Sequence, residues 1–184
     1  MEIKQGLIQG AIHHRSPHQD ERPLEDDISL IVVHGISLPP GEFGGEAIID
    51  FFCHRLDHTA HPYYAGIKDL EVSAHLVILR AGTLLQFVPF DKRAWHAGPS
   101  QFEGRERCND FSIGIELEGQ DDIPYTESQY QTLATVVGLL RRTYPMIERH
   151  AIVGHSDVAP GRKTDPGTAF DWDHFQNLVD LEKS

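Results

Sequence analysis

The sequence predicts a mixed α/β fold in which helices flank a central β-sheet. Short apolar runs separated by turn residues predict strands, and apolar residues at helical spacing predict amphipathic helices between them. The predicted order is strand, helix, three strands, long helix, short strand and helix, which is typical of helices packed on one mixed sheet. The 184 residues contain no internal repeat or low-complexity linker, so we expect one domain over residues 1–184.

The strands are predicted from short runs rich in β-branched and other apolar residues. Residues 29–34 form a continuous run of this kind, as in a strand that is covered on both faces. The runs at 73–79 and 84–88 flank a turn that contains glycine and are predicted to form a hairpin. Alternation predicts a further strand at 111–117, and residues 152–154 are predicted as a short strand.

Three segments carry apolar residues at helical spacing. Residues 46–56 place their apolar side chains on one stripe, and residues 172–181 predict a C-terminal amphipathic helix. The strongest helical pattern covers residues 126–144. It starts with Thr126 and Gln129, whose types and spacing fit a capping box.

Charge and composition exclude several classes of protein. Lys and Arg number 16 against 28 Asp and Glu, a formal net charge of −12, which argues against partners such as nucleic acid or an anionic membrane surface. No apolar run approaches the roughly 20 residues of a membrane span, and the start of the chain lacks the pattern of a signal peptide. Cys53 and Cys108 do not make a disulfide framework, so we expect reduced thiols and a cytoplasmic protein.

The strand at 111–117 is the first candidate for chemistry. One of its faces is apolar, and the other carries in order Ser112, Gly114, Glu116 and Glu118. Two small residues followed by acidic ones predict an open floor that ends in two carboxylates. A carboxylate that points into a cleft can act as a general base. The alternative is a half-exposed sheet face with solvated glutamates.

Histidine and aspartate residues at two places suggest a metal site. His34 ends the first predicted strand, and the irregular segment 154–167 is stiffened by two Pro-Gly pairs. Zinc prefers imidazole nitrogens and carboxylate oxygens, and a catalytic zinc keeps three protein ligands and one open position. His155 and Asp165 with His34 could supply these ligands, and Asp157 is the competing carboxylate by spacing alone. The alternative for His34 is a structural histidine whose ring is satisfied by its neighbours.

Longer motifs resemble one enzyme family. Their order and spacing are similar to those of the N-acetylmuramoyl-L-alanine amidase family, which shares its fold with peptidoglycan recognition proteins. The motifs are VVHGISLPPGEFGG, VSAHLVILRAG, AWHAG, RERCNDFSIGIELEG and VGHSDVAPGRKTDPG. The resemblance covers nearly the whole chain, and it is strongest to a cytoplasmic branch that acts on 1,6-anhydro-N-acetylmuramyl substrates.

The resemblance implies a zinc-dependent amidase with one Zn²⁺ per chain. It implies that His34, His155 and Asp165 bind the metal. It further implies that Glu116 takes the proton of the attacking water and that Lys163 stabilises the developing oxyanion. The bond cut would be the amide between the lactyl group of N-acetylmuramic acid and the L-alanine of a stem peptide, in the recycling of muropeptides from the cell wall.

Substrate contacts and departures from the family pattern also follow from the resemblance. Trp95 and Arg107 lie in segments that line the substrate cleft in the family. The family leads us to expect Asn where this chain has Gly35, and the branch tends to carry a basic residue where it has Glu71. Both changes bear on substrate affinity and on preference for the anhydro sugar. The expected partner is a small muropeptide, with no obligate protein partner.

Other functions remain as alternatives. A non-catalytic peptidoglycan-binding module can use the same fold, and turnover of any muropeptide would exclude it. An exported amidase that attacks intact cell wall is a second alternative, which the lack of a signal peptide disfavours. The third is a plain zinc-binding or interaction protein.

Overall fold

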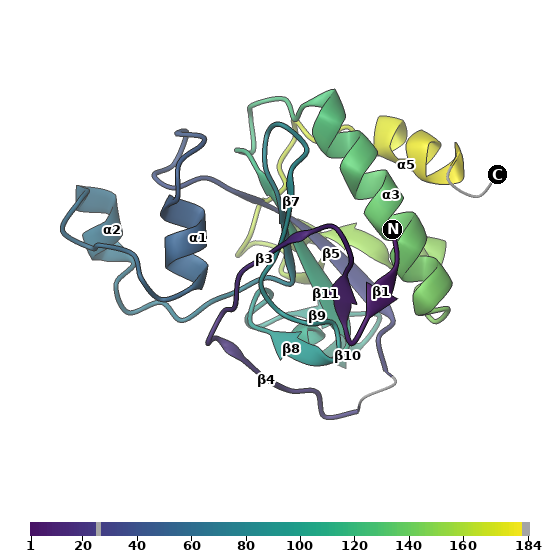
Figure 1. Ribbon diagram of the computed structural model, residues 1–184. Coiled ribbons are helices and arrows are strands. Elements are labelled where there is room, and N and C mark those ends of the chain that lie inside the picture. Colours follow the sequence, from purple (N-terminus) through teal and green to yellow (C-terminus); the bar gives the residue numbers. More distant parts are fainter. Residues whose placement is uncertain (25–26, 182–184) are drawn as a thin grey trace.

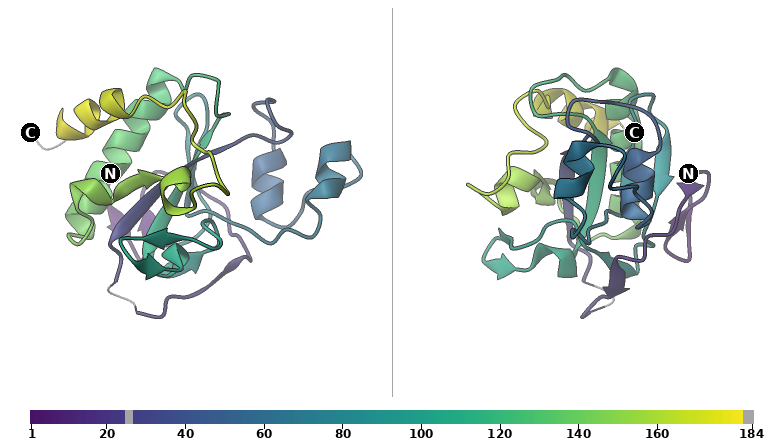
Figure 2. Two further views of the ribbon diagram at one scale, coloured as in Figure 1. Left: turned by 180° about the vertical axis from the view of Figure 1, so that it is seen from behind. Right: turned by 90° about the vertical axis from the view of Figure 1, so that its left-hand side faces the viewer.

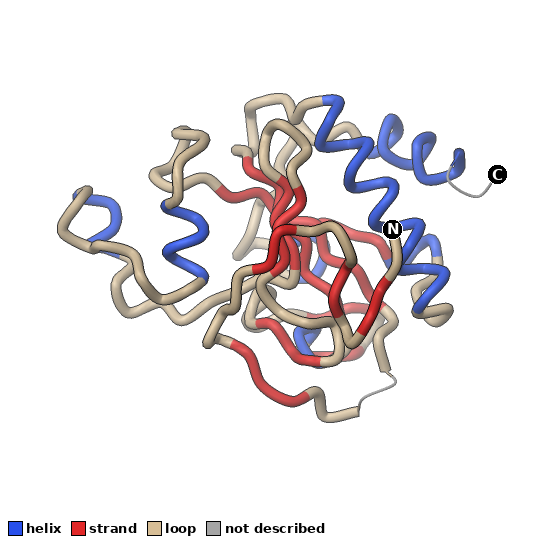
Figure 3. Tube along the Cα trace, in the orientation of Figure 1, coloured by secondary structure: helices blue, strands red, loops and turns tan. Residues whose placement is uncertain are grey.

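The structure, a computed structural model, describes residues 1–24 and 27–181. A six-stranded sheet forms its centre. Helices lie on both sides of this sheet, in two groups that Figures 1 and 3 place at opposite ends of the view and that Figure 2 shows from behind. The predicted fold class, a central mixed sheet flanked by helices, is confirmed. None of the described helices is both long enough and apolar enough to span a membrane.

The central sheet has the strand order β12-β5-β11-β6-β7-β3. Strands β5, β6, β11 and β12 run parallel, whereas β7 is antiparallel to β6 and β3 is parallel to β7. All the predicted strands are present, with ends that differ from the predicted ones by up to three residues. The bounds are β3 Ile12–His13, β5 Leu30–Ile36, β6 Leu76–Ile78, β7 Leu84–Gln86, β11 Ser112–Glu118 and β12 Ile152–Gly154.

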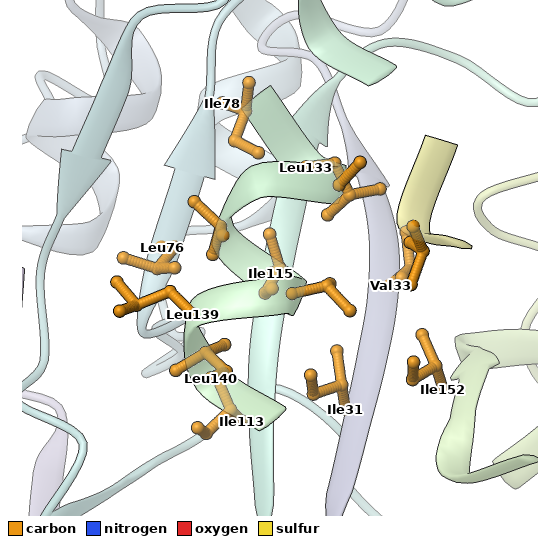
Figure 4. Packing of buried hydrophobic residues seen from close by; sticks show 14 of the residues in the cluster. Ile31, Val33, Leu76, Ile78, Ile113, Ile115, Leu133, Leu139, Leu140 and Ile152 are labelled. Carbon is orange, nitrogen blue, oxygen red and sulfur yellow. The ribbon is translucent and has the colours of Figure 1, made fainter. Parts of the chain in front are cut away.

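One face of the sheet is covered by the two predicted C-terminal helices. Helix α3, Glu127–Thr143, begins at the predicted capping box, and α5, Trp172–Leu181, packs beside it. Figure 4 shows α3 lying over the sheet, with Leu133 above Ile115 and its neighbours. These side chains are fully buried, so this apolar layer holds the parallel strands in place.

Two further apolar clusters lie on the other face. One packs α1, Ala47–Phe52, and α2, Pro62–Gly66, against β6 and β7, and the other lies under β5 and β12. Between them runs a polar stripe of β11, the even-numbered residues from Ser112 to Glu118. This stripe is buried as well, so the alternative of a half-exposed face with solvated glutamates is wrong.

Helix α1 is shorter than the sequence predicts. The apolar spacing at 46–56 predicts one helix, but the helix ends at Phe52. His54 has a left-handed backbone with φ 57°, which turns the chain out of the helical path. Leu56 therefore packs against the apolar cluster from a loop.

Several short elements were not predicted. Each of these strands and helices is too short to show an apolar period, so no pattern marks it in the sequence. They are β1 Ile3–Lys4, β2 Leu7–Ile8, β3, β4 Gln19–Glu21, β8 Lys92–Ala94, β9 Gln101–Phe102, β10 Arg105–Glu106, α2, α4 His155–Val158 and the 3₁₀ helices η1 Cys108–Asp110 and η2 Arg149–Ala151. Two of them position the site described next: α4 and η1.

Candidate active site

Three neighbouring strands, β12, β5 and β11, bring side chains with functional groups to one level of the sheet. The parallel pairing of β11 with β5 sets Glu116 beside His34. The pairing of β12 with β5 sets Gly154 beside Val33, so His155 follows where β12 ends and α4 begins. In α/β proteins the carboxyl ends of parallel strands are where functional groups gather. The register thus brings together three residues that lie far apart in the sequence.

A cluster of three donor atoms lies at this edge. The Nδ1 atoms of His34 and His155 are 3.0 Å apart, and Oδ2 of Asp165 lies 3.1 Å from the first and 3.0 Å from the second. Both rings are buried, with 1% and 3% of the residue exposed. Among residues 1–24 and 27–181, these three form the group of side chains that is arranged to hold a metal ion.

Asp157, the competing carboxylate, lies outside this cluster. Its Oδ2 accepts a hydrogen bond from the backbone N–H of Gly154 at 2.7 Å, which caps the start of α4. The residue is exposed. The sequence offered two carboxylates as the third ligand, and the structure brings Asp165 to the histidines.

The hydrogen bond on the far side of His155 fixes which ring nitrogen carries the proton. Nε2 of His155 lies 3.1 Å from the carbonyl oxygen of Ala97, which can only accept a hydrogen bond. Nε2 is therefore the donor, and in the neutral ring Nδ1 keeps its lone pair. That lone pair faces the Asp165 carboxylate and His34, so the three atoms can share a proton or, in its place, a metal ion. The residues fit a metal ion on this ground.

His34 has a matching partner. Its Nε2 lies 2.9 Å from Nδ1 of His96, and Nε2 of His96 lies 3.0 Å from Oγ of Ser112. Burial, with the charges of His155 and Lys163 in support, lowers the pKa of His34 to about 4. Burial lowers the pKa of His96 well below its ordinary value, and the neighbouring His34 lowers it further. Both rings are therefore neutral at pH 7, the form in which imidazole binds metal or accepts a hydrogen bond.

Asp165 is held ionised in this setting. Burial by itself raises the pKa of its carboxyl group, but the adjacent rings of His155 and His34 outweigh burial and lower the pKa below its usual range. The backbone of the same segment is anchored on both sides. The Asp165 carbonyl accepts from the N–H of Ser156 at 3.0 Å, and the Tyr125 hydroxyl donates to the Pro166 carbonyl at 2.9 Å.

Glu116 is a buried carboxyl group beside the cluster. Burial raises its pKa well above the ordinary value, Asp165 adds to this, and the Lys163 ammonium opposes it. Its Oε2 has no hydrogen-bond partner within the part of the chain that the structure describes. An unpartnered carboxyl oxygen in a cavity is suited to taking up and returning a proton. Lys163 itself is exposed and lines the same cavity.

The floor predicted from the small residues of β11 is filled, not open. A Cβ atom at Gly114 would collide with the ring of His96, and Ser112 bonds to that ring. Glu118, the second carboxylate, does not reach the site. It is buried and accepts from the backbone N–H groups of Gly44 and Arg80, so it fastens two loops.

A cavity of about 340 Å³ opens over the cluster. His34, Glu116, His155, Lys163 and Asp165 all line it. The rest of its wall is largely apolar and comes from the region of α1 and α2 and from the segment before β11. Those side chains include Leu38, Phe51, Phe52, Tyr63, Ile67, Leu70 and Trp95. A polar cluster beside an apolar wall can hold a ligand with both kinds of surface.

The two predicted substrate-binding residues lie in different places. Trp95 lines the cavity with the metal cluster. Arg107 does not: it lines a separate depression with Arg162, its side chain is 70% exposed, and it pairs with Asp110 at 3.2 Å. The backbone of Arg107 is left-handed, with φ 62°. A role for Arg107 in substrate binding stays a prediction.

The two departures from the family pattern have different surroundings. A Cβ at Gly35 would collide with the hydroxyl of Tyr125, so in this structure the tyrosine takes the space that a larger side chain would need. Glu71 is exposed between Leu70 and Val72, which both line the cavity. An exposed acidic residue therefore lies between two cavity-lining residues, at the position where the family branch tends to carry a basic one.

His96 and Tyr125 contribute to the site but were not predicted to do so. The motif that contains His96 drew attention to Trp95 instead, and Tyr125 lies just before a helix start, where it carries no distinctive pattern. Their contacts with His34 and with the Pro166 carbonyl join segments more than 40 residues apart. The surplus of histidines, 12 in all, was the available signal for His96.

Comparisons with known proteins agree with this geometry. A family model described as N-acetylmuramoyl-L-alanine amidase matches residues 24–168. The 1,6-anhydro-N-acetylmuramyl-L-alanine amidase AmpD of Escherichia coli (strain K12) is 57% identical over 182 residues, 99% of each chain. A crystal structure of a selenomethionine derivative of AmpD superposes with a TM-score of 0.94 at 56% identity, covering 97% of this chain and 99% of that one.

A more distant relative has been solved with a ligand. It is the N-acetylmuramyl-L-alanine amidase AmiD from E. coli, in complex with the substrate anhydro-N-acetylmuramic acid-L-Ala-D-gamma-Glu-L-Lys. It superposes with a TM-score of 0.62 at 28% identity, over 86% of this chain and 60% of that one. The family match and the AmpD relatives span most or all of the chain. This chain belongs to the N-acetylmuramoyl-L-alanine amidase family.

Proposed function

We propose that this chain is a zinc-dependent hydrolase that cleaves the amide between the lactyl group of 1,6-anhydro-N-acetylmuramic acid and the L-alanine of a stem peptide. The observation that carries the proposal is the convergence of His34, His155 and Asp165 beside a buried, unpartnered carboxyl oxygen of Glu116. The amidase family and the AmpD relatives, whose name specifies the 1,6-anhydro substrate, support the choice of bond.

The donor set favours zinc over other common divalent cations. Two imidazole nitrogens and one carboxylate oxygen are typical of catalytic zinc, whereas magnesium and calcium prefer oxygen ligands alone. His34, His155 and Asp165 would hold the ion. Zinc, when bound, acts as a Lewis acid and lowers the pKa of water to about 7.

Glu116 and Lys163 supply the remaining chemistry. Oε2 of Glu116 accepts the proton from the attacking water and returns it to the leaving amide nitrogen, which would otherwise depart as a poor leaving group. The raised pKa of the buried Glu116 favours holding that proton between the two steps. The Lys163 ammonium, which lies in the same cavity, offsets the negative charge that develops on the carbonyl oxygen.

The shape of the cavity fits a substrate with a sugar ring and a peptide. The apolar wall and Trp95 offer a surface for the less polar face of the sugar. Gly35 presents no side chain, so substrate groups near the ion must be bound by other residues or by backbone. Long-range steering of an acidic stem peptide toward a chain of net charge −12 is unfavourable.

We also place this activity in the cytoplasm, in the recycling of soluble muropeptides. Cys53 and Cys108 are both free thiols, as in a reducing compartment. We expect a small-molecule substrate and no obligate protein partner.

The first test is hydrolysis of a soluble 1,6-anhydro-muropeptide by the purified protein. We expect release of a peptide that begins with L-alanine, loss of that release after chelation, and recovery on adding zinc. Absence of release by a folded, zinc-loaded protein would contradict the proposal and favour a binding module. Faster release from intact sacculi than from the soluble substrate would instead favour a wall-lytic enzyme.

Metal content separates the two candidate carboxylates. Asp165→Ala removes one of three donors, so we expect the purified variant to retain little zinc. Asp157→Ala removes only a hydrogen bond at the start of α4, so its zinc content should match that of the wild type, at a cost of about 0.5–1.5 kcal/mol in stability. Elemental analysis after dialysis measures both. The reverse pattern would show that Asp157 is the ligand.

Glu116→Gln tests the proton role. The amide has nearly the shape of the carboxyl group but cannot take up a proton, so we expect kcat to fall by about 10²–10⁴-fold with zinc content unchanged. Steady-state kinetics on the anhydro-muropeptide, together with elemental analysis, give both values. Glu71→Gln is the control, an exposed glutamate between two cavity-lining residues that should keep its kcat within a few-fold. Normal turnover in Glu116→Gln would exclude this role.

A further inference from the structure

Two consecutive residues orient both metal-binding histidines. The side chain of His96 faces Nε2 of His34, and the carbonyl of Ala97 accepts from Nε2–H of His155. His34 lies in β5 and His155 begins α4, 121 positions apart in the sequence. One dipeptide in the loop after β8 therefore contacts the Nε2 atom of both rings, on the side away from the metal cluster. Any shift of this loop would move both hydrogen bonds at once.

The side chain of Asn109 holds the two backbone N–H groups of this dipeptide, while the guanidinium of Arg162 donates to the Ala97 carbonyl. Oδ1 of Asn109 accepts from the backbone N–H of His96 at 3.1 Å and from that of Ala97 at 2.8 Å. Two successive N–H groups that converge on one oxygen fix the direction of the peptide plane between them. The carbonyl of Ala97 and the side chain of His96 leave the backbone from that fixed segment.

Asn109 is itself held in place by the buried side chain of Arg22. It lies in η1, and its carbonyl accepts from the guanidinium of Arg22 at 3.3 Å. Arg22 is buried and also donates to the carbonyls of Phe90, Asp110 and Ser112. This guanidinium therefore ties η1 to the sheet. The position of Asn109 is set by the fold rather than by the loop that it holds.

We propose that Asn109 is a positioning residue for the metal site. By fixing His96 and Ala97, its carboxamide oxygen holds both ligand rings in the orientation that directs their Nδ1 atoms at one point. It touches neither the substrate nor the reacting atoms. This inference rests on the proposed function, because it assigns the support of the same zinc site.

The chemistry of position 109 makes the inference testable. Asp has the same length as Asn and presents an oxygen in the same place, so Asn109→Asp retains the acceptor. Asn109→Ala removes it and leaves two backbone N–H groups without their partner. Arg162 still donates to the Ala97 carbonyl in that variant, but the peptide plane between His96 and Ala97 is no longer fixed from its N–H side, so the partners of both histidines are less firmly placed. Loss of support of this kind weakens metal binding by about 10–100-fold.

Ser100 offers a matched control. Its Oγ accepts from the N–H of Cys108 at 3.1 Å and donates to the carbonyl of Gly98 at 2.9 Å. It therefore joins the same loop to the same 3₁₀ helix, but not through the N–H groups of His96 and Ala97. Ser100→Ala loosens the contact between loop and helix and leaves the proposed support intact.

The test is the dissociation constant for zinc, measured by competition with a chromophoric chelator. We expect it to rise by about 10–100-fold in Asn109→Ala, and to stay within about threefold of the wild type in Asn109→Asp and Ser100→Ala. Thermal unfolding of the zinc-free proteins reports fold stability separately. At saturating zinc, kcat of Asn109→Ala should largely recover with KM unchanged. Should Asn109→Ala not fold, Asn109→Ser, whose shorter side chain ends before the two N–H groups, carries the same expectation.

The outcomes distinguish this inference from the function on which it rests. Unchanged zinc affinity in a folded Asn109→Ala protein overturns the positioning role and leaves the amidase proposal standing. An equal loss of affinity in Ser100→Ala also overturns it, since general loosening would then explain the effect. A wild-type protein that binds no zinc and releases no peptide overturns both.

Discussion

The hydrogen bond between the His155 ring and the Ala97 carbonyl determines the character of the site. A carbonyl oxygen cannot donate, so this bond places the proton of the ring on Nε2 and leaves Nδ1 with a lone pair. That lone pair points at Asp165 and at a second imidazole, with separations of 3.0 Å in both cases. Three such atoms at this distance share a cation, which can be a proton or a metal ion. Hydrogen bonds on the far side of each ring hold the donors in place, which lowers the cost of ordering them when a metal binds.

This arrangement depends on a polar layer inside the sheet. The central strand β11 is buried along its whole length, and its polar face carries His96 above Gly114 in place of an apolar core. Buried polar groups cost free energy unless they are hydrogen-bonded, and here the network from Arg22 through Asn109 to His96 meets that demand. The apolar layer under α3 on the opposite face supplies the stability that the polar face does not. The division follows from the two-residue period of the strand, which sends alternate side chains to the two faces.

Periodicity explains what the sequence could predict. The five strand runs and the two C-terminal helices have clear periods or caps, and all are present. The metal cluster could also be predicted from the sequence, because His34 ends a predicted strand and His155 and Asp165 share one motif. The hydrogen bonds that hold this cluster could not be predicted. They are made by His96 and Asn109, which lie in loops that the sheet and Arg22 bring together. The same limit applies to the floor of β11: two small residues predicted open space, whereas a ring from a distant loop occupies it.

The most direct test of the account is X-ray diffraction from zinc-loaded crystals at the zinc absorption edge. The account predicts one strong anomalous peak per chain, within about 2.0–2.2 Å of Nδ1 of His34, Nδ1 of His155 and a carboxylate oxygen of Asp165. It further predicts that the Ala97 carbonyl and the His96 ring keep their hydrogen bonds to these histidines. A peak bound by other side chains, or histidine rings that turn to bind zinc through Nε2, would contradict it.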